Sequence, residues 1–476
     1  MRAALRYLAL RNPRIAAAVK PVVVPFIVAF TSGVHTAIRI FRRASAAHHL
    51  KTASTQPGAP GMGTLAQGRR VLMVVVSDLR IDPRVEREAR SLVAGGYEVH
   101  VVCPDPTIGM EPGIRIDWGP GVTIRLVNWR AMQFIMERPG FMGLELFEAA
   151  LAVAQELRPL AIHAHDLNTC LVGLAVAHQT GTHLVADFHE WTSENVQWNS
   201  RSGRNEPYPE DWKAELQTLE SRVMREASAV ITVCDSIAEA MEEELGMGEG
   251  QSRKVEVIRN IPLLSAQPTK DYPSLKSQLG LPESQFVLLW QGGTGPTRLI
   301  EPIIEALEFA PACVFAIRGP SLDLFGEGYR KIADKAGAGD RLILLDPVPS
   351  RDVVAAARGA DAGIWTLPRL CRNFTYALPN KIFEYTASNL ALLVADYPEA
   401  RRMVETHGIG LTFDPYDPRS IAAAINRLID EPGLAAGFRA NTQAALKSLD
   451  TEREWQKLVT LYDALPRTGD KYSPGL

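Results

Sequence analysis

A helix that runs almost directly into a wholly apolar strand is the feature that most constrains the fold of this chain. Residues 378–396 read LPNKIFEYTASNLALLVAD. Pro379 and Asn380 form a turn that opens a helix, and the aliphatic run 390–395 follows closely. Continuous aliphatic runs are typical of strands that are buried on both faces of a parallel sheet. The segment therefore predicts an α/β fold.

The start of this predicted helix is suited to binding an anion. Backbone N–H groups in a first helical turn have no intrahelical partners, and ligands of open α/β sheets lie against helix N-termini. Lys381 can reach a phosphate there, and the carboxylate of Glu384 can accept sugar hydroxyls. Asn380, Lys381 and Glu384 are therefore candidates for binding a nucleotide diphosphate. The alternative is that Lys381 and Glu384 form a solvated ion pair on a surface helix, worth about 0.2–0.5 kcal/mol.

The length and the charge distribution limit the class of protein. A chain of 476 residues should hold two domains, because a single core stops growing at roughly 250–300 residues. Eleven basic residues and no acidic residue precede Asp78, although the whole chain has a net charge of −3. The remainder is therefore net acidic, which argues against a nucleic-acid partner, whereas the basic start favours an anionic surface.

The five cysteines are widely separated, and most of them lie within apolar runs. An odd number of scattered cysteines is typical of reduced core thiols in a cytosolic protein. Neither CxxC, HExxH nor Asp-x-Asp occurs in the sequence, so we expect no built-in metal site.

Residues 1–68 differ in composition from the rest of the chain and form a basic, partly apolar extension. The apolar run 21–30 has flanking arginines but is shorter than the roughly 20 residues that a membrane-spanning helix needs. We therefore expect residues 1–43 to contact an anionic membrane surface peripherally. An organellar transit peptide and a structureless tail are the alternatives, and a secretory signal is disfavoured because arginines follow the apolar run. Residues 51–68 are rich in Gly, Pro, Ser and Thr and form a linker.

The first predicted domain covers residues 69–265 and starts with a βαβ unit. A continuous apolar strand at 71–76 is followed by a helix at 84–94, whose apolar residues recur at helical spacing, and by a strand at 97–103. The turn after the first strand lacks G-x-G-x-x-G, which disfavours a dinucleotide-binding dehydrogenase.

Two pairs of polar residues follow successive strands of this domain. His165 and Asp166 follow one predicted strand, and His189 and Glu190 follow the next. The tips of successive parallel strands open onto the same cleft, so His165, Asp166 and Glu190 are candidates for the acceptor side. Alternatively, His165 is a structural histidine bonded to the backbone.

An aromatic segment follows at residues 191–212. It places Trp191, Trp198, Tyr208 and Trp212 among polar and turn residues. Because indoles offer large apolar faces, the segment is either an acceptor-recognition loop or the anchor of a surface loop.

The second predicted domain covers residues 266–448 and repeats the α/β plan. Its first strand opens into the glycine-rich loop QGGTGP, and Arg298 is predicted to head the next helix. Gly292 and Gly293 let backbone amides approach a phosphate closely, and Arg298 can add a bidentate contact. Residues 449–476 should hold a terminal helix that packs back across both domains, and a tail.

Over residues 70–465 the sequence resembles the retaining glycosyltransferases of the family-four type. Four segments together carry the likeness: Asp82-Pro83-Arg84-Val85-Glu86-Arg87-Glu88-Ala89, His163-Ala164-His165-Asp166, Asp187-Phe188-His189-Glu190 and Pro379-Asn380-Lys381-Ile382-Phe383-Glu384-Tyr385. The resemblance implies an α/β protein of two doubly wound Rossmann-like domains with a cleft between them, the GT-B architecture.

The resemblance also implies roles for three residues. Glu384 matches the second acid of the family's E-x7-E motif, which holds the ribose of the donor. Arg298 occupies the place of a basic residue that contacts the diphosphate, and His189 that of a histidine near the transferred sugar.

The sequence departs from the family pattern at two positions. The first acid of the motif falls at Tyr376, and the second basic position of the glycine loop falls at Gly293. We expect Lys381 to supply the missing positive charge.

The resemblance implies a glycosyltransferase that moves a sugar from a nucleotide-diphosphate sugar to a polysaccharide- or lipid-linked acceptor, with retention of configuration and without a metal or cofactor. Fixed cations and a helix N-terminus can stabilise the charge that develops on the departing diphosphate. The expected catalytic residues are His189, Arg298 and Lys381, and the expected donor-binding residues are Gly292, Gly293, Asn380 and Glu384.

The expected location is the cytoplasm, peripheral on the inner membrane face, where the basic extension would act. The alternatives are a nucleotide-sugar epimerase or phosphorylase on the same architecture, and a non-catalytic member that binds a nucleotide sugar. The epimerase or phosphorylase would not require the basic apolar extension, and Tyr376 and Gly293 favour the non-catalytic alternative.

Overall fold

The structure is a computed structural model that describes residues 69–80, 82–104, 116–127, 144–199, 202–245, 255–262 and 268–466. The basic extension, including the expected membrane contact of residues 1–43, and the C-terminal tail lie outside these residues. In the described part, no helix combines the length and the apolar character needed to cross a bilayer.

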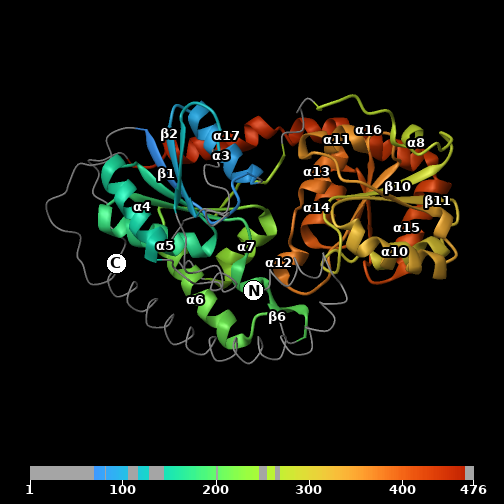
Figure 1. Ribbon diagram of the computed structural model, residues 1–476, viewed down its shortest axis with the longest axis horizontal. Helices are drawn as coiled ribbons and strands as arrows, with labels where there is room; N and C mark the ends of the chain where they lie inside the picture. The colour runs from blue at the N-terminus through green and yellow to red at the C-terminus, as the bar shows by residue number, and fades with distance from the viewer. Residues whose placement is uncertain are drawn as a thin grey trace, which may run out of the picture.

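The first domain is built on a seven-stranded parallel sheet with strand order β3-β2-β1-β4-β5-β8-β9 (Figure 1). Its strands are β1 (Arg70–Val74), β2 (Glu98–Pro104), β3 (Val122–Val127), β4 (Ala161–His165), β5 (His183–Phe188), β8 (Ala229–Thr232) and β9 (Glu256–Val257). Its helices are α3 (Pro83–Ala94), α4 (Leu144–Leu157), α5 (Asp166–Thr180), α6 (Glu210–Glu226) and α7 (Asp235–Glu244), and β6 (Val196–Asn199) with β7 (Arg204–Pro207) forms a separate antiparallel hairpin.

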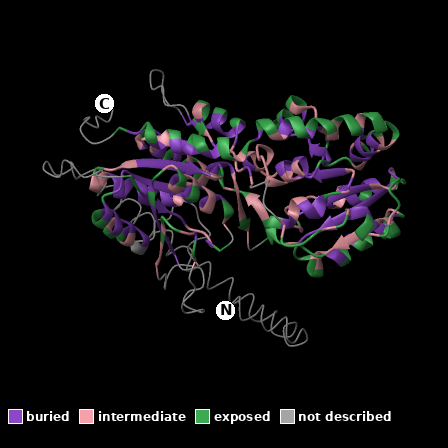
Figure 2. Cartoon of the chain, turned by 90° about the horizontal axis from the view of Figure 1, so that it is seen from above, coloured by how far each residue is buried: buried purple, intermediate pink, exposed green. Residues whose placement is uncertain are grey.

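Burial on both faces of the sheet explains why its central strands are continuous apolar runs. Every residue of β1 from Val71 to Val74 is fully buried, and Figure 2 shows the buried strands of both sheets inside helices with exposed outer faces. Helix α3 starts where the sequence predicts it, because the side chain of Asp82 accepts a hydrogen bond from the backbone N–H of Val85 and Pro83 occupies the first turn.

The second domain is built on a six-stranded parallel sheet with strand order β12-β11-β10-β13-β14-β15. Its strands are β10 (Phe286–Gln291), β11 (Cys313–Arg318), β12 (Leu342–Leu345), β13 (Ala362–Trp365), β14 (Ala391–Ala395) and β15 (Gly410–Phe413). Its helices are α8 (Leu275–Gln278), α9 (Glu301–Glu305), α10 (Leu322–Lys335), α11 (Val353–Ala357), α12 (Arg372–Thr375), α13 (Asn380–Ala387), α14 (Pro398–His407), α15 (Pro418–Asp430) and α16 (Pro432–Ser448). The predicted helix and buried strand of residues 378–396 are confirmed as α13 and β14, and the predicted fold class is confirmed.

The helix after the glycine-rich loop starts later than the sequence predicts. Arg298 does not head it, because α9 begins at Glu301 and Arg298 lies in the preceding turn, whose Leu299 has a positive φ of 53°. Pro302 explains the difference. It has no N–H to donate to the carbonyl of Arg298 and is tolerated only in a first helical turn.

The terminal helix α17 (Thr451–Asp463) returns from the second domain to the first, as predicted, and lies beside α3 (Figure 1). Trp455, Leu458 and Tyr462 are buried in the core on the α3 face of the first sheet. The carboxylate of Glu454 also pairs with Arg259, in the segment that leaves the first domain, at 2.8 Å. The helix therefore fastens the second domain to the first.

Candidate active site between the two domains

A cavity of about 560 Å³ lies between the two domains. The first domain contributes the tips of α3 and β5 to its wall, and the second contributes the end of β10 and the start of α13. Of the predicted site residues, those that line it are His189, Glu190, Gly292, Asn380, Lys381 and Glu384. A hollow of about 620 Å³ elsewhere on the second domain contains none of the predicted site residues.

Lys381 lies against the glycine-rich loop at the bottom of this cavity. A Cβ atom on Gly292 would be 2.7 Å from the Nζ of Lys381, and this Nζ lies 5.3 Å from the ring centroid of Trp290. Burial lowers the pKa of Lys381 to about 8, although Glu384 one turn later opposes the shift. A partly desolvated ammonium group at a helix start is ready to accept an anion.

Gly292 is needed for this arrangement, because its φ of +121° is rarely adopted by residues with a side chain. We expect Gly292→Ala to lower the free energy of unfolding by about 1–3 kcal/mol and to weaken nucleotide binding by displacing Lys381. Urea denaturation measures the change in stability, and calorimetric titration with UDP measures the change in affinity.

The matched control is Gly328→Ala, because Gly328 lies in α10 with open space around its Cβ position. This change should stabilise the chain by about 0.5–1 kcal/mol. Equal effects of both changes on UDP binding would contradict the role of Gly292.

Glu384 and Arg298 are charged neighbours of the lysine. Glu384 lines the cavity, and burial raises the pKa of its carboxyl group. Arg298 does not line the cavity, but its guanidinium lies beside Gly293, where an added Cβ would be 3.2 Å from Nε. Burial lowers the pKa of Lys381 and the charge of Arg298 adds to this effect, whereas burial raises the pKa of Glu190 and the charge of Arg298 opposes the rise. Arg298 thus lies against the glycine-rich loop, close enough to Lys381 for their charges to interact.

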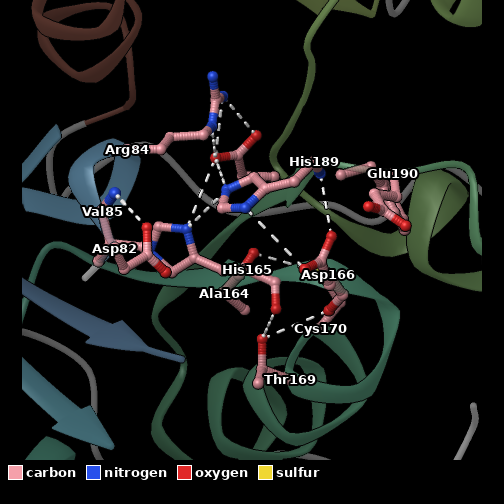
Figure 3. Close-up of polar contacts among 12 residues, drawn as sticks. Asp82, Arg84, Val85, Ala164, His165, Asp166, Thr169, Cys170, His189 and Glu190 are labelled. Atoms are coloured by element: carbon pink, nitrogen blue, oxygen red, sulfur yellow. Dashed lines mark hydrogen bonds and ion pairs between the residues drawn. The ribbon is translucent and has the colours of Figure 1, made fainter. Parts of the chain in front are cut away.

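His189 is held at the end of β5 by two acidic residues (Figure 3). Its Nε2 lies 2.8 Å from the carboxylate of Asp187, and its backbone N–H donates to Asp166 at 3.0 Å. Burial alone would lower the pKa of His189, but these two carboxylates outweigh it and raise the pKa to about 9. The imidazole is therefore positively charged at neutral pH.

His165 lies behind His189 and does not line the cavity. Its Nδ1 is 3.2 Å from the Nε2 of His189, and burial together with His163 lowers the pKa of His165 to about 3. Asp166 does not line the cavity either, and it supports the His189 backbone. Their positions favour structural roles, so of the acceptor-side candidates only Glu190 faces the cleft.

A buried ion network connects α3 to His189. Arg84 donates to Asp187 at 2.9 Å and pairs with Glu88 at 3.0 Å. Glu88, His165, Asp187 and His189 offer ligand atoms within 4.8 Å of one another, as a metal site would. Arg84 already places a cation between the two carboxylates, however, so their charge does not require a metal ion.

The aromatic segment after β5 contains residues that fit each of the two predicted roles, the anchor of a loop and the recognition of an acceptor. Trp191 is fully buried in the first-domain core. Trp198 lies on the β6–β7 hairpin and is 54% exposed. Trp191 therefore anchors the segment, whereas Trp198 is exposed and Tyr208 and Trp212 are half-buried, so these three side chains are accessible for acceptor recognition.

Two contributors to the site were not predicted from the sequence. One is Arg84, which lies in a segment that carries the family resemblance and whose partner Asp187 precedes His189 by two residues. The other is Asn373 in α12, which lines the cavity and accepts a hydrogen bond from the backbone N–H of Trp191 at 2.9 Å. No pattern in the sequence predicts that α12 contacts the first domain.

Two parallel α/β domains with a cavity between them form the GT-B architecture, which is found in glycosyltransferases. Residues 81–260 match the family described as "Glycosyl transferase 4-like domain", and residues 271–445 match the family described as "Glycosyl transferases group 1". The chain therefore belongs to the family-four type of glycosyltransferases, in agreement with its sequence motifs.

Curated relatives are glycosyltransferases by name. The chain is similar to a D-inositol 3-phosphate glycosyltransferase of Thermobifida fusca, with 25% identity over 291 residues that cover 57% of this chain and 62% of that protein. The match thus spans less than two thirds of that relative. A protein of the same name from Nocardioides is 24% identical over 375 residues, which cover 73% of this chain and 78% of that protein.

Solved structures share the fold. Sucrose-phosphate synthase from Thermosynechococcus elongatus is similar with a TM-score of 0.65 at 16% identity, over 83% of this chain and 99% of that one. HepE of Anabaena in complex with UDP has a TM-score of 0.61 at 16% identity, over 83% of this chain and 100% of that one. HepE was also solved in complex with UDP-glucose.

Proposed function

We propose that this chain transfers a sugar from a nucleotide-diphosphate sugar to a polysaccharide- or lipid-linked acceptor, with retention of configuration. One observation carries the proposal: the Nζ of Lys381 lies against Gly292 at the start of α13, inside the interdomain cavity. A diphosphate bound there would meet a cation, a glycine backbone and a helix N-terminus. The complexes of HepE with UDP and UDP-glucose support the choice of donor.

The proposed reaction uses charges that are already in place. The bond from the anomeric carbon to the diphosphate breaks, and the acceptor oxygen bonds to that carbon on the same face. Lys381, Arg298 and the N-terminus of α13 stabilise the charge that develops on the leaving diphosphate. The acceptor proton passes to the departing phosphate, so no protein group acts as general base. The proposal needs no metal and no cofactor, since the nucleotide sugar is a substrate.

The donor is identified by titrating the purified chain with UDP-, GDP- and ADP-sugars and analysing the products formed with and without a glycan acceptor. Transfer, or slow hydrolysis of the sugar, supports the proposal. Epimerised sugar or sugar phosphate as the product would instead support an epimerase or a phosphorylase.

Tyr376 favours a second candidate function, that of a non-catalytic protein that binds a nucleotide sugar. Its ring packs beside Trp191 instead of lining the cavity, so the family's first acid has no equivalent at this position. Binding of a nucleotide sugar without either transfer or hydrolysis would establish this alternative.

A peripheral location on the inner membrane face is also part of the proposal, supported by the eleven basic residues before Asp78. Sedimentation with vesicles that contain phosphatidylserine tests it. The full chain should bind them and a chain without residues 1–68 should not. Equal binding by the two chains would contradict the proposal.

Nucleotide binding should depend on pH because of Lys381. Only its protonated form attracts a diphosphate, and the pKa of about 8 means that this form is lost as the pH rises above 8. We expect the affinity for UDP to fall by about tenfold per pH unit above that value. Lys381→Met should remove this dependence, whereas a slope that persists in this variant would assign it to another group, such as His189.

A further inference from the structure

Helix α12 belongs to the second domain but is attached to the first. The guanidinium of Arg372 lies 4.4 Å from the ring centroid of Trp191 and forms an ion pair with Glu244 of α7. The Oδ1 of Asn373 accepts a hydrogen bond from the backbone N–H of Trp191 at 2.9 Å. Because of these contacts, residues from both domains form the wall at one end of the cavity.

Asn373 and Glu190 lie side by side at this end of the cavity. Asn373 is only 7% exposed, yet it lines the cavity, and its Nδ2 lies 3.5 Å from the Oε2 of Glu190. The same Oε2 accepts a hydrogen bond from the side chain of Asn195. Within the described part of the chain, no hydrogen bond engages the other carboxylate oxygen of Glu190. The amide of Asn373 and the carboxylate of Glu190 are thus held next to each other, and both can form further hydrogen bonds.

Their position relative to Lys381 indicates which part of a substrate they meet. Glu384 lies one helical turn beyond Lys381, on the side where the donor's ribose is proposed to bind. Glu190 follows His189 on the opposite wall, within the electrostatic influence of Arg298. A donor that extends from Glu384 past Lys381 therefore brings its sugar to Glu190 and Asn373.

Glu190 is also the one described carboxylate that the cavity offers at this end. The other carboxylates that line the cavity belong to Asp82, which caps α3, and to Glu384. Tyr376, where the family pattern has an acid, packs beside Trp191 and does not line the cavity. The acidic group for this end is thus supplied by the first domain.

We propose that Glu190 and Asn373, one from each domain, bind hydroxyl groups of the sugar that is transferred. A carboxylate accepts hydrogen bonds, and an amide both donates and accepts them, which matches neighbouring hydroxyls of a pyranose. The proposal rests on the proposed function, since it needs a nucleotide sugar in the cavity. It moves Glu190 from the acceptor side, where sequence analysis placed it, to the donor sugar.

The test compares the binding of UDP and UDP-glucose, or of the nucleotide and nucleotide sugar that the donor screen selects. Glu190→Gln and Asn373→Asp should each leave the affinity for the nucleotide within about twofold and weaken that for the nucleotide sugar by about 10- to 100-fold. Asn373→Asp keeps an acceptor for the Trp191 N–H, so the attachment of α12 should survive, while it replaces the Nδ2 donor with a second carboxylate oxygen beside Glu190. Glu215→Gln, on the exposed face of α6, is the matched control and should change neither affinity.

Three outcomes would overturn the proposal: equal weakening of both ligands, unchanged affinity for both, or a change confined to the KM of the acceptor. The last of these would return Glu190 to the acceptor side. Failure of the unmodified chain to bind any nucleotide would instead refute the proposed function itself.

Discussion

Lys381→Met should weaken the binding of a nucleoside diphosphate by roughly 100-fold, because a charge-assisted hydrogen bond to phosphate is lost in a partly desolvated site. Methionine is unbranched like lysine and fills most of the same volume, but it removes the ammonium group that lies over the ring of Trp290. The free energy of unfolding should not fall, since burial already disfavours the charged form of Lys381. Calorimetric titration with UDP measures the affinity, and urea denaturation measures the stability.

The matched control is Lys331→Met. Lys331 lies on the exposed face of α10, where it pairs with Glu327. This change removes the same charge from the whole chain and should leave UDP binding unchanged. If Lys331→Met and Lys381→Met had the same effect, net charge and not a contact in the cavity would account for nucleotide binding.

Arg84→Met should lower the free energy of unfolding by about 3–5 kcal/mol, the usual cost of removing one partner from a buried ion pair. The guanidinium of Arg84 is 3% exposed and neutralises Asp187 and Glu88, which are equally buried. It also donates to the backbone carbonyl of Ile258 at 3.0 Å and lies 5.5 Å from the ring of Trp455. Its removal therefore leaves Glu88 without its arginine partner and Asp187 with His189 as its remaining cation, at the junction of β5, β9 and α17. Urea denaturation gives the difference.

The control for this change is Arg90→Met on the same helix. Arg90 pairs with Glu86 on the surface of α3, and such exposed pairs contribute about 0.2–1 kcal/mol. A loss below about 1 kcal/mol for Arg84→Met would mean that the carboxylates are protonated in the folded chain and need no cation.

The central strands of both sheets were predictable because burial on both faces requires continuous aliphatic runs. The runs predicted as strands at residues 71–76, 97–103 and 390–395 form the inner strands β1, β2 and β14, with each end within two residues of the prediction. Short or half-exposed strands carry no such signal, so β3, β15 and the β6–β7 hairpin were missed. Helix α4 was also left out, although its sequence has a clear helical period.

The candidate site was predictable only where one segment contains the relevant chemistry. The start of α13 and the glycine-rich loop each hold their candidates within a few residues, and the structure brings Lys381 against Gly292. The link between Arg84 and Asp187 joins residues 103 positions apart. Asn373 becomes part of the cavity only through the contact between the domains. Such contacts depend on tertiary packing, so no periodic pattern in the sequence predicts them.

The most direct test of the account is a crystal structure of the full chain with the nucleotide sugar that binds most tightly. We predict diphosphate oxygens at about 2.7–3.0 Å from the Nζ of Lys381, with the sugar directed toward His189 and Glu190. A diphosphate bound outside the interdomain cavity, or one that makes no contact with α13, would contradict the account.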